Sequence, residues 1–315
     1  MQNKAEKIVL LGTGGTIAGT SAQAGDNVGY TSGQLSVAHL IAAVPALGRV
    51  PLEAEQVAQL DSKDMSHAVW QALAQRVAAH LARPEVAGMV ITHGTDTLEE
   101  TAWFLHRVLA PTKPVVLTCA MRPASSLQPD GPQNLLDAVT VAQSGVAQGV
   151  LCVAQGQVLA AEDVRKVHGY RIDAFSAGDA GPVARVEEGQ LIALRPWPEA
   201  QALGLSAITQ DAAQWPRVGV VCSHAGVEPW AVDAAVAAGL QGLVVEGTGN
   251  GTVHHRLEAA LQQAQSAGLR VLRASRCVAG GVVGAPAGAL PSADGLTPAK
   301  ARVELLLQLL AKASA

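Results

Sequence analysis

The sequence predicts an α/β fold built on a doubly wound, mixed or parallel sheet. Short β-branched runs recur along the chain and are typical of strands buried on both faces. Ala- and Leu-rich segments of helical period lie between them, and such alternation is typical of α/β proteins. A weakly periodic stretch at residues 194–217 interrupts the alternation. We therefore expect a larger amino-terminal domain at residues 1–193, a linker, and a smaller α/β domain with a parallel sheet at residues 218–315.

The apolar runs place the expected strands in order along the chain. They predict strands at residues 7–11, 87–94, 113–120, 148–154, 218–224, 242–249 and 269–275. The helical periods predict helices at residues 67–82, 97–110, 134–144, 230–239 and 256–268, where Ala and Leu favour the helical state. The strands that begin at residues 7 and 87 both run into glycine- and threonine-rich turns.

The composition is that of a compact globular protein. Hydrophobic residues make up 49% and charged residues 15% of 315 residues, which is long enough for two domains. The net charge is −4 and Lys and Arg are scattered, so we expect no nucleic-acid partner. No apolar stretch approaches the ~18–20 residues that span a bilayer, so we expect no membrane partner.

The four cysteines, Cys119, Cys152, Cys222 and Cys277, lie in or beside apolar runs, without CxxC or metal spacing. We expect buried free thiols, which suit a reducing compartment, and neither a metal nor an organic cofactor. The first residues enter a strand directly and lack the pattern of a signal peptide. The expected location is the cytoplasm, or the periplasm if a signal peptide has been removed.

Two turns carry the candidate chemistry, "LLGTGGTIAGT" at residues 10–20 and "VITHGTDTLEET" at residues 90–101. Phosphate binding is a weak interpretation, because the dinucleotide pattern started at Gly12 needs a glycine where Ile17 stands, and Gly-Lys-Ser/Thr is absent. A purely structural tight turn explains the glycines but not the threonines. A hydroxyl at such a turn is well placed to be a nucleophile, with backbone N–H groups nearby to stabilise an oxyanion.

Three further polar positions could assist that hydroxyl. Tyr30, one of two tyrosines in the chain, ends an irregular loop that could close over a substrate, although surface packing is the simpler alternative. Asp96 follows Thr95 at the start of a predicted helix, where it could equally be a cap. Lys166 lies close to Asp163 and would by default be exposed to solvent.

"TGGTIAG" (residues 13–19) and "HGTDTLEET" (residues 93–101) resemble the two signature motifs of the bacterial-type L-asparaginase family. The resemblance covers nearly the whole chain, because further segments follow in the family's order at residues 61–70, 120–139, 158–166, 247–252 and 296–309. It implies hydrolysis of L-asparagine to L-aspartate and ammonia, with L-glutamine as an alternative substrate. It also implies a homotetramer built as a dimer of dimers.

The resemblance implies a role for each matching residue. Thr16 corresponds to the nucleophile that forms the acyl-enzyme, and Tyr30 to the lid-loop tyrosine that contacts it. Thr95, Asp96 and Lys166 match a second polar triad, in which the lysine favours proton movement through Thr95. Asp96 would also hold the α-ammonium group of the substrate.

The expected substrate-binding set surrounds these groups. Ser62 matches the residue that binds the α-carboxylate, and Gly15 and Gly94 occupy the turns beside the reacting groups. Asp61 and Lys63 flank Ser62, and Thr95 and Asp96 complete the set. Lys63 stands where periplasmic members commonly have glutamine, so it would repel the ammonium group unless it turns away or pairs with a neighbouring aspartate.

The implied tetramer would place each site between one subunit's first domain and its neighbour's second. Asn250 and Thr252, in "GTGNGT", would then be the contacts with the partner's site. The late loop at residues 277–295 lacks the glutamate with which periplasmic members support the lid tyrosine. This departure and Lys63 leave one alternative of another class, an amino-acid-binding protein of the same fold with impaired catalysis.

Overall fold

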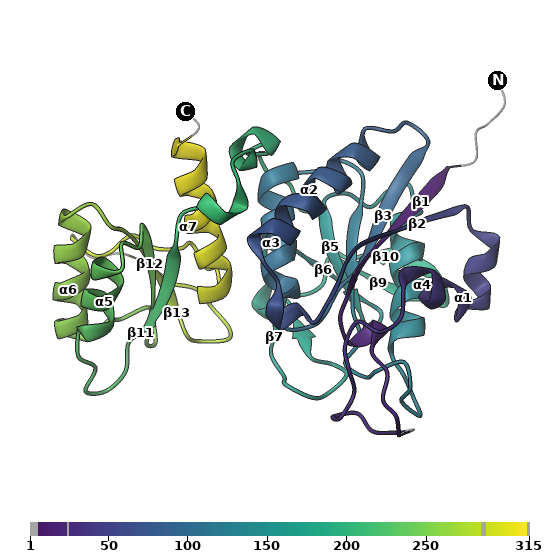
Figure 1. The fold of residues 1–315 in the computed structure, drawn as a ribbon, viewed down its shortest axis with the longest axis horizontal. Coiled ribbons are helices and arrows are strands. Elements are labelled where there is room, and N and C mark those ends of the chain that lie inside the picture. Colours follow the sequence, from purple (N-terminus) through teal and green to yellow (C-terminus); the bar gives the residue numbers. More distant parts are fainter. Residues whose placement is uncertain (1–5, 24, 285–287, 314–315) are drawn as a thin grey trace. The chain divides into compact units, whose positions relative to one another are not determined.

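A computed structural model describes residues 6–23, 25–284 and 288–313, so residue 24 of the loop before Tyr30 and residues 285–287 of the late loop lie outside the described residues. The chain divides into two compact units, Met1–Leu205 and Ser206–Ala315 (Figure 1). The segment predicted as a linker, residues 194–217, contains only two short 3-10 helices, η5 (Leu205–Ile208) and η6 (Ala212–Gln214).

The first unit contains a mixed sheet that is eight-stranded over the described residues, in the order β10-β9-β6-β5-β4-β3-β1-β2. Neighbouring strands from β2 across to β5 are parallel, while β6, β9 and β10 pair antiparallel. The strands are β1 (Lys7–Gly14), β2 (Leu52–Leu60), β3 (Val86–Thr92), β4 (Val115–Thr118), β5 (Val150–Ala154), β6 (Gln157–Ala160), β9 (Ala184–Glu187) and β10 (Gln190–Ala193). A separate hairpin pairs β7 (Arg165–Lys166) with β8 (Phe175–Ser176).

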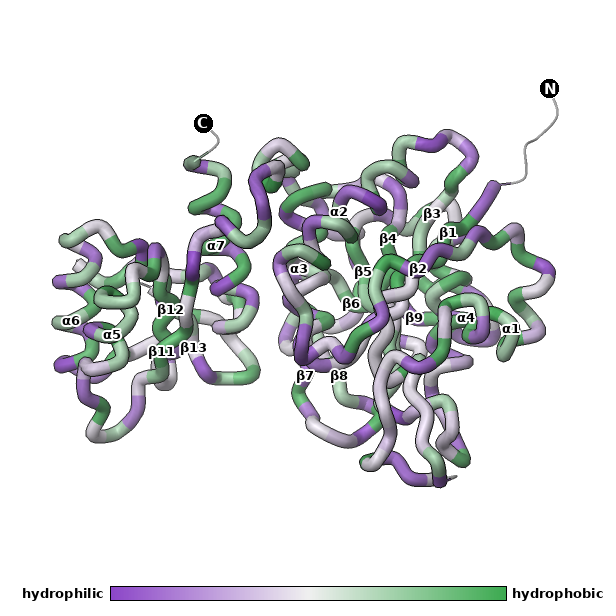
Figure 2. The backbone as a smooth tube through the Cα atoms, viewed as in Figure 1, coloured by the Kyte–Doolittle hydropathy of each residue, from purple (hydrophilic) through white to green (hydrophobic). Residues whose placement is uncertain are grey.

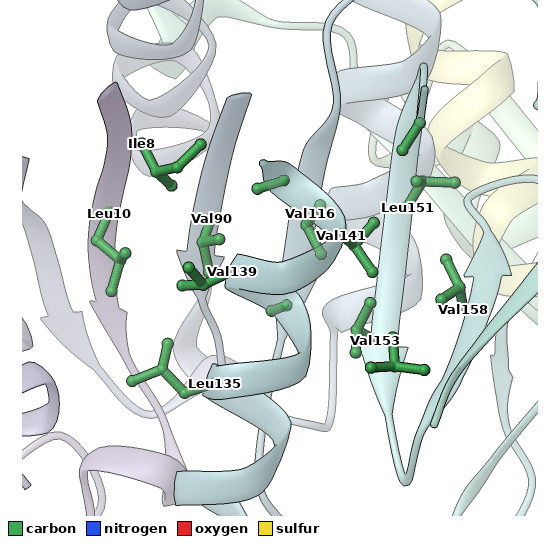
Figure 3. Packing of buried hydrophobic residues seen from close by; sticks show 14 of the residues in the cluster. Ile8, Leu10, Val90, Val116, Leu135, Val139, Val141, Leu151, Val153 and Val158 are labelled. Carbon is green, nitrogen blue, oxygen red and sulfur yellow. The ribbon is translucent and has the colours of Figure 1, made fainter. Parts of the chain in front are cut away.

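Helices cover both faces of this sheet, so the predicted doubly wound arrangement is confirmed. The helices are α1 (Val37–Ala42), α2 (His67–Leu81), α3 (Leu98–Leu109) and α4 (Gly131–Ala142), with 3-10 helices η1 (Thr16–Ala18), η2 (Pro45–Arg49), η3 (Ser62–Asp64) and η4 (Gly178–Ala180). On one face, Leu135 and Val139 of α4 pack against Leu10, Val90 and other strand side chains (Figure 3). On the other face, Trp70 of α2 stacks on Phe104 of α3 with 5.0 Å between ring centroids.

Burial of these side chains stabilises the unit. A fully buried Leu or Val contributes roughly 1.5–3 kcal/mol relative to the exposed side chain. The hydropathy of the backbone trace follows this pattern, with hydrophobic residues along the central strands (Figure 2). Because β1, β3 and β4 are parallel, their carboxyl ends lie at one edge of the sheet, where the two glycine-rich turns meet.

The second unit is a smaller three-layer α/β structure. Its parallel sheet has the order β11-β12-β13. The strands are β11 (Val218–Cys222), β12 (Gly242–Gly247) and β13 (Arg270–Ser275), and the helices are α5 (Trp230–Ala237), α6 (His255–Ser266) and α7 (Pro298–Ala313). One core joins the sheet to α5 and α6, and a second joins it to α7. The predicted fold class, two α/β parts with a smaller parallel sheet in the second, is confirmed.

All four cysteines are free thiols, but the prediction that all are buried is wrong for two of them. Cys119 and Cys152 are buried in the first unit. Cys222 and Cys277 are exposed, because Cys222 ends the edge strand β11 and Cys277 lies in the loop after β13. Among the described residues, no helix combines the length and the apolar character needed to cross a bilayer.

Candidate active site

The two glycine-rich turns are in direct backbone contact at the carboxyl ends of β1 and β3. Gly14 and Gly15 have φ angles of 104° and 83°, a left-handed conformation that favours glycine. A Cβ atom added to Gly15 would lie 2.4 Å from both the Cα and the N of Gly94. This close approach brings the residues after each turn, Thr16 and Thr95, to the same edge of the sheet.

Thr16 begins η1 and is buried, with 6% of its surface exposed. Its Oγ1 lies 2.7 Å from the Oη of Tyr30. The loop between them closes on itself, because Thr20 and Thr31 exchange two backbone hydrogen bonds and the Gly33 N–H donates to the Gly15 carbonyl. The sequence-predicted contact between the lid-loop tyrosine and the first turn is therefore present.

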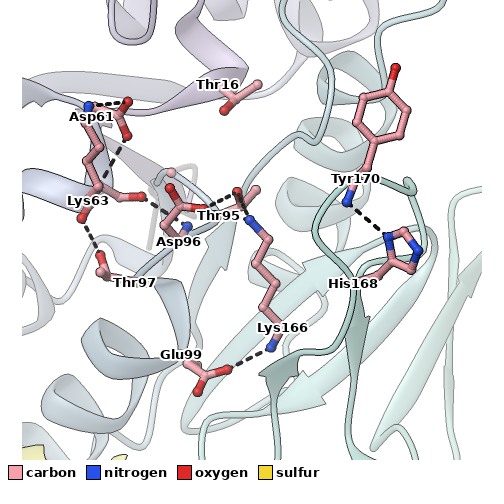
Figure 4. A network of polar contacts seen from close by, with 12 residues as sticks. Thr16, Asp61, Lys63, Thr95, Asp96, Thr97, Glu99, Lys166, His168 and Tyr170 are labelled. Atoms are coloured by element: carbon pink, nitrogen blue, oxygen red, sulfur yellow. Dashed lines mark hydrogen bonds and ion pairs between the residues drawn. The ribbon is translucent and has the colours of Figure 1, made fainter. Parts of the chain in front are cut away.

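The second turn and β7 together form a polar triad (Figure 4). The Lys166 Nζ donates to Thr95 Oγ1 at 2.9 Å and to Asp96 Oδ1 at 2.7 Å. The backbone N–H of Lys166 donates to Glu99 Oε2 at 2.7 Å, which ties the short strand β7 to the first turn of α3. Asp96 is half exposed, with 51% of its side chain accessible, so its carboxylate is open to a ligand.

Ser62 lies beneath this triad and is 2% exposed. Its Oγ accepts a hydrogen bond from the Asp96 backbone N–H at 3.1 Å, and its carbonyl accepts one from Thr97 Oγ1 at 2.8 Å. A Cβ atom added to Gly94 would lie 2.4 Å from the Ser62 Oγ. Ser62 is thus held against both the second turn and the start of α3.

Lys63 forms ion pairs within its own loop. Its Nζ lies 2.8 Å from Asp61 Oδ2 and 3.3 Å from Asp64 Oδ2, and 61% of the side chain is exposed. Burial acts to raise the pKa of the Asp61 carboxyl, but Lys63, through its hydrogen bonds and charge, and a hydrogen bond from Ser32 together lower that pKa. Lys63 is thus paired with neighbouring aspartates, which is one of the two conditions under which we expect it not to repel an ammonium group.

Sequence reasoning missed His93, which lies directly under the second turn. The side chain is fully buried, with Nδ1 2.7 Å from the Gly94 carbonyl oxygen and Nε2 2.9 Å from Thr101 Oγ1. Burial lowers the pKa of His93 to about 4, although the hydrogen bond with Gly94 acts in the opposite direction. The signal was available, since a histidine at the end of an apolar strand needs polar partners once buried.

Asn250 and Thr252 belong to the second unit, in the turn after β12. The Asn250 side chain donates to the Val283 carbonyl and accepts from the Val283 N–H, each at 2.7 Å. Thr252 Oγ1 lies 2.8 Å from Thr248 Oγ1. Both residues are exposed. These bonds give the turn a defined shape.

The arrangement of these residues suits acyl transfer. The buried Thr16 hydroxyl is hydrogen-bonded to the Tyr30 phenol. The Lys166 ammonium group is hydrogen-bonded to the hydroxyl of a second threonine and to a carboxylate. Such a pair of hydroxyls can supply a nucleophile and move its proton. Among the described residues, no three His, Cys, Asp or Glu side chains are grouped so that they could hold a metal ion.

Comparisons with known proteins agree over most of the chain. Residues 7–198 match the family model "Asparaginase, N-terminal", and residues 217–315 match "Glutaminase/Asparaginase C-terminal domain". L-asparaginase 2 of Escherichia coli is 36% identical over 311 residues, which are 96% of this chain and 88% of that protein. Glutaminase-asparaginase of Pseudomonas fluorescens is 35% identical over 285 residues, covering 90% and 78%.

A solved structure gives the same result. The crystal structure of a probable cytoplasmic L-asparaginase from Campylobacter jejuni superimposes with a TM-score of 0.92 at 36% identity, covering 98% of this chain and 96% of that one. The two family models together span nearly all of the sequence, and the polar cluster lies within the first. The chain therefore belongs to the asparaginase family.

Proposed function

We propose that the protein is an L-asparagine amidohydrolase that forms L-aspartate and ammonia through an acyl-enzyme at Thr16. The observation that carries this proposal is the Thr16–Tyr30 hydroxyl pair, on a turn packed backbone to backbone against the turn that bears Thr95 and Asp96. Relatives that cover most of the chain are named L-asparaginases. Family membership and the hydroxyl pair thus support the same reaction.

The substrate is held by its zwitterionic end. The Asp96 contacts with Lys166 and Thr95 involve Oδ1, which leaves Oδ2 for the α-ammonium group. The Ser62 hydroxyl, which accepts from the Asp96 backbone, can donate its own proton to the α-carboxylate. Charge-assisted hydrogen bonds of this kind are the stronger ones. They convert a chance encounter into an oriented attack on the side-chain amide.

The reaction follows in two steps. Thr16 Oγ1 attacks the amide carbon as its proton passes to the Tyr30 oxygen, while the Tyr30 hydroxyl passes its own proton to the amide nitrogen. Collapse of the tetrahedral intermediate then breaks the C–N bond and releases ammonia. Water next attacks the ester: its hydroxyl completes the carboxyl group of aspartate, and its other proton returns through Tyr30 to Thr16 Oγ1 as the C–O bond breaks. The Lys166 ammonium favours negative charge on Thr95 Oγ1, so Thr95 can relay a proton during either step.

Replacement of the nucleophile tests the proposal. We expect Thr16→Ala to lower kcat for ammonia release from L-asparagine by at least ~10³-fold, because the covalent step is lost. Thr20→Ala is the matched control. Thr20 lies on the same segment, and its hydrogen bonds with Thr31 are made by the backbone, so the substitution retains them. Equal ammonia release by Thr16→Ala and wild type would rule out the assignment.

L-glutamine is the second candidate substrate, because two relatives at 35% identity are named glutaminase-asparaginase. One methylene changes the binding free energy by only ~1–3 kcal/mol in an apolar pocket. The same assay with L-glutamine gives the ratio of the two kcat/KM values. Binding of L-asparagine in calorimetry without release of ammonia would instead favour the binding protein with impaired catalysis.

We infer that the chain assembles as a tetramer, a dimer of dimers, in which Asn250 and Thr252 approach the site of a partner subunit. Their turn is exposed and its shape is held by the Asn250 hydrogen bonds to Val283, as a preformed contact surface requires. Light scattering at the assay concentration should give the mass of four chains. A fully active monomer would contradict the shared site.

We also infer a cytoplasmic location. The Campylobacter jejuni structure, which covers 98% of this chain, is described as a probable cytoplasmic L-asparaginase. The four cysteines are free thiols, which persist in a reducing compartment.

A further inference from the structure

A buried chain of hydrogen bonds runs from α2 through α3 to the second glycine-rich turn. The Trp70 Nε1 donates to Thr101 Oγ1 at 2.8 Å, Thr101 Oγ1 lies 2.9 Å from His93 Nε2, and His93 Nδ1 lies 2.7 Å from the Gly94 carbonyl oxygen. Trp70 is 3% exposed, and Thr101 and His93 are 0% exposed. Water therefore does not compete for these groups.

The direction of every hydrogen bond in the chain is determined by its two ends. An indole N–H can only donate and a carbonyl oxygen can only accept. Because the Gly94 carbonyl oxygen can only accept, the proton of the neutral imidazole resides on Nδ1 and is donated to Gly94. Nε2 then has no proton and accepts from Thr101 Oγ1, which itself accepts from Trp70. The ring is thereby held as the neutral Nδ1–H tautomer, and burial lowers its pKa to about 4.

The carbonyl that His93 holds belongs to the Gly94–Thr95 peptide group. Since a trans peptide is planar, its C=O and N–H point in opposite directions. Fixing the Gly94 oxygen toward the buried imidazole therefore aims the Thr95 N–H away from the core. That N–H makes no hydrogen bond within the described part of the chain. It is free to donate to a molecule bound at the turn.

The packing around Gly94 leaves this peptide little other freedom. A Cβ atom at Gly94 would lie 2.7 Å from the Ser62 Cβ and 3.2 Å from the Gly15 Cα, so neighbouring atoms crowd the residue on that side. His93 forms a hydrogen bond with the Gly94 carbonyl oxygen, and Ser62 and Gly15 crowd the Gly94 Cα. Together they determine the direction of the Thr95 N–H, a donor beside Thr16.

We propose that His93, held in one tautomer by Thr101 and Trp70, is a positioning residue that orients the Gly94–Thr95 peptide for catalysis. This role rests on the proposed amide hydrolysis. His93 exchanges no proton with the substrate, because its second nitrogen already accepts from Thr101. Its contribution is to the transition state, where a fixed donor is worth more than a mobile one.

Two substitutions at Thr101 test the proposal through kinetics. Thr101→Val removes the hydroxyl at nearly constant volume, and we expect kcat with L-asparagine to fall about 10- to 100-fold, with KM within about twofold of wild type. Thr101→Ser keeps the hydroxyl and should restore most of kcat. Thr101→Val with wild-type kcat, or a Thr101→Ser variant as impaired as Thr101→Val, would overturn the proposal.

The tautomer itself gives a readout that does not depend on activity. In ¹⁵N-histidine NMR of the wild-type protein near pH 7, we expect a protonated Nδ1 and an unprotonated Nε2 for His93, assigned by the loss of its signals in His93→Asn. An Nε2–H tautomer, or a charged ring, would overturn the proposal even if Thr101→Val fails to fold. Failure of the proposed function can be told apart from failure of this proposal, because the wild-type protein would then release ammonia from neither L-asparagine nor L-glutamine.

Discussion

Gly94 shows at the scale of one residue why the second turn contains glycine. Its Cα lies between the backbone of the first turn and the side chain of Ser62, where an added Cβ would approach the Ser62 Oγ to 2.4 Å. Ser62 cannot move away freely, because it is buried and hydrogen-bonded to Asp96 and Thr97. The residue therefore couples the proposed α-carboxylate site to the nucleophile turn.

We expect Gly94→Ala to lower kcat/KM for L-asparagine by about 100-fold, because displacement by about 1 Å of a positioning group can cost that much. Much of the loss should be in KM, since Ser62 is the group displaced. Gly48→Ala is the control, because Gly48 is exposed and a Cβ there meets nothing within 4 Å. Steady-state kinetics on both variants check this. A Gly94→Ala enzyme within twofold of wild type would be incompatible with the packing argument.

Lys63 shows a limit of reasoning from residue types alone. The sequence places a cation beside the expected ammonium site, but its charge is compensated within three residues by Asp61 and Asp64. The pKa of Lys63 is raised, first by the hydrogen bond with Asp61, so the side chain stays charged and paired. Its distance from the substrate depends on the rotamer, which no pattern of residues specifies.

At the scale of elements, α3 organises the site through its first turns. Thr97 at its start bonds the Ser62 carbonyl, Glu99 accepts from the Lys166 backbone, and Thr101 contacts His93. Leu98, Leu105 and other side chains of the helix lie in the core. Residues two positions apart lie about 200° apart around a helix axis, so the start of α3 makes these contacts in different directions, with the Ser62 loop, with β7 and with His93.

The sequence predicted those elements whose periodicity comes from burial. Strands such as β3 and β4 are apolar on both faces and were expected. The edge strand β2 was not, because every residue along it is at least partly exposed and its polar residues hide the pattern. The hairpin of β7 and β8 has two residues in each strand, too few for any period.

The same distinction applies to the site. Thr16 and Thr95 stood out because a tight turn explains the glycines beside them but not the threonines. Tyr30 and Asp96 had structural alternatives, and the family resemblance gave them their expected roles. The position of Lys166 depends on the contact of its backbone with Glu99, 67 residues earlier in the chain, which local sequence does not encode. His93 was hidden inside a recognised motif, because the chain of contacts through Thr101 to Trp70 runs over two different helices.

At the scale of the whole molecule, the buried imidazole makes stability depend on pH. Folding lowers the pKa of His93 from 6.5 to about 4, so between these values the unfolded chain binds a proton that the folded chain does not. Protonation therefore favours unfolding. The stabilisation from keeping this ring neutral is complete above pH 6.5 and is lost as the pH falls through 4. The lowered pKa of Glu53, to about 2, acts only below pH 4.5.

His93→Asn isolates this contribution, because asparagine does not titrate and its amide can still donate to the Gly94 carbonyl. We expect the free energy of unfolding of wild type, relative to this variant, to fall by about 3 kcal/mol between pH 8 and pH 4. Urea titrations followed by tryptophan fluorescence at pH 8, 6 and 4 measure the difference, and effects of Glu53 cancel because both proteins contain it. A difference that does not change with pH would mean that the pKa of His93 is the same in the folded and unfolded protein, as for an imidazole exposed to water, and the buried chain from Trp70 to Gly94 would then not exist in solution.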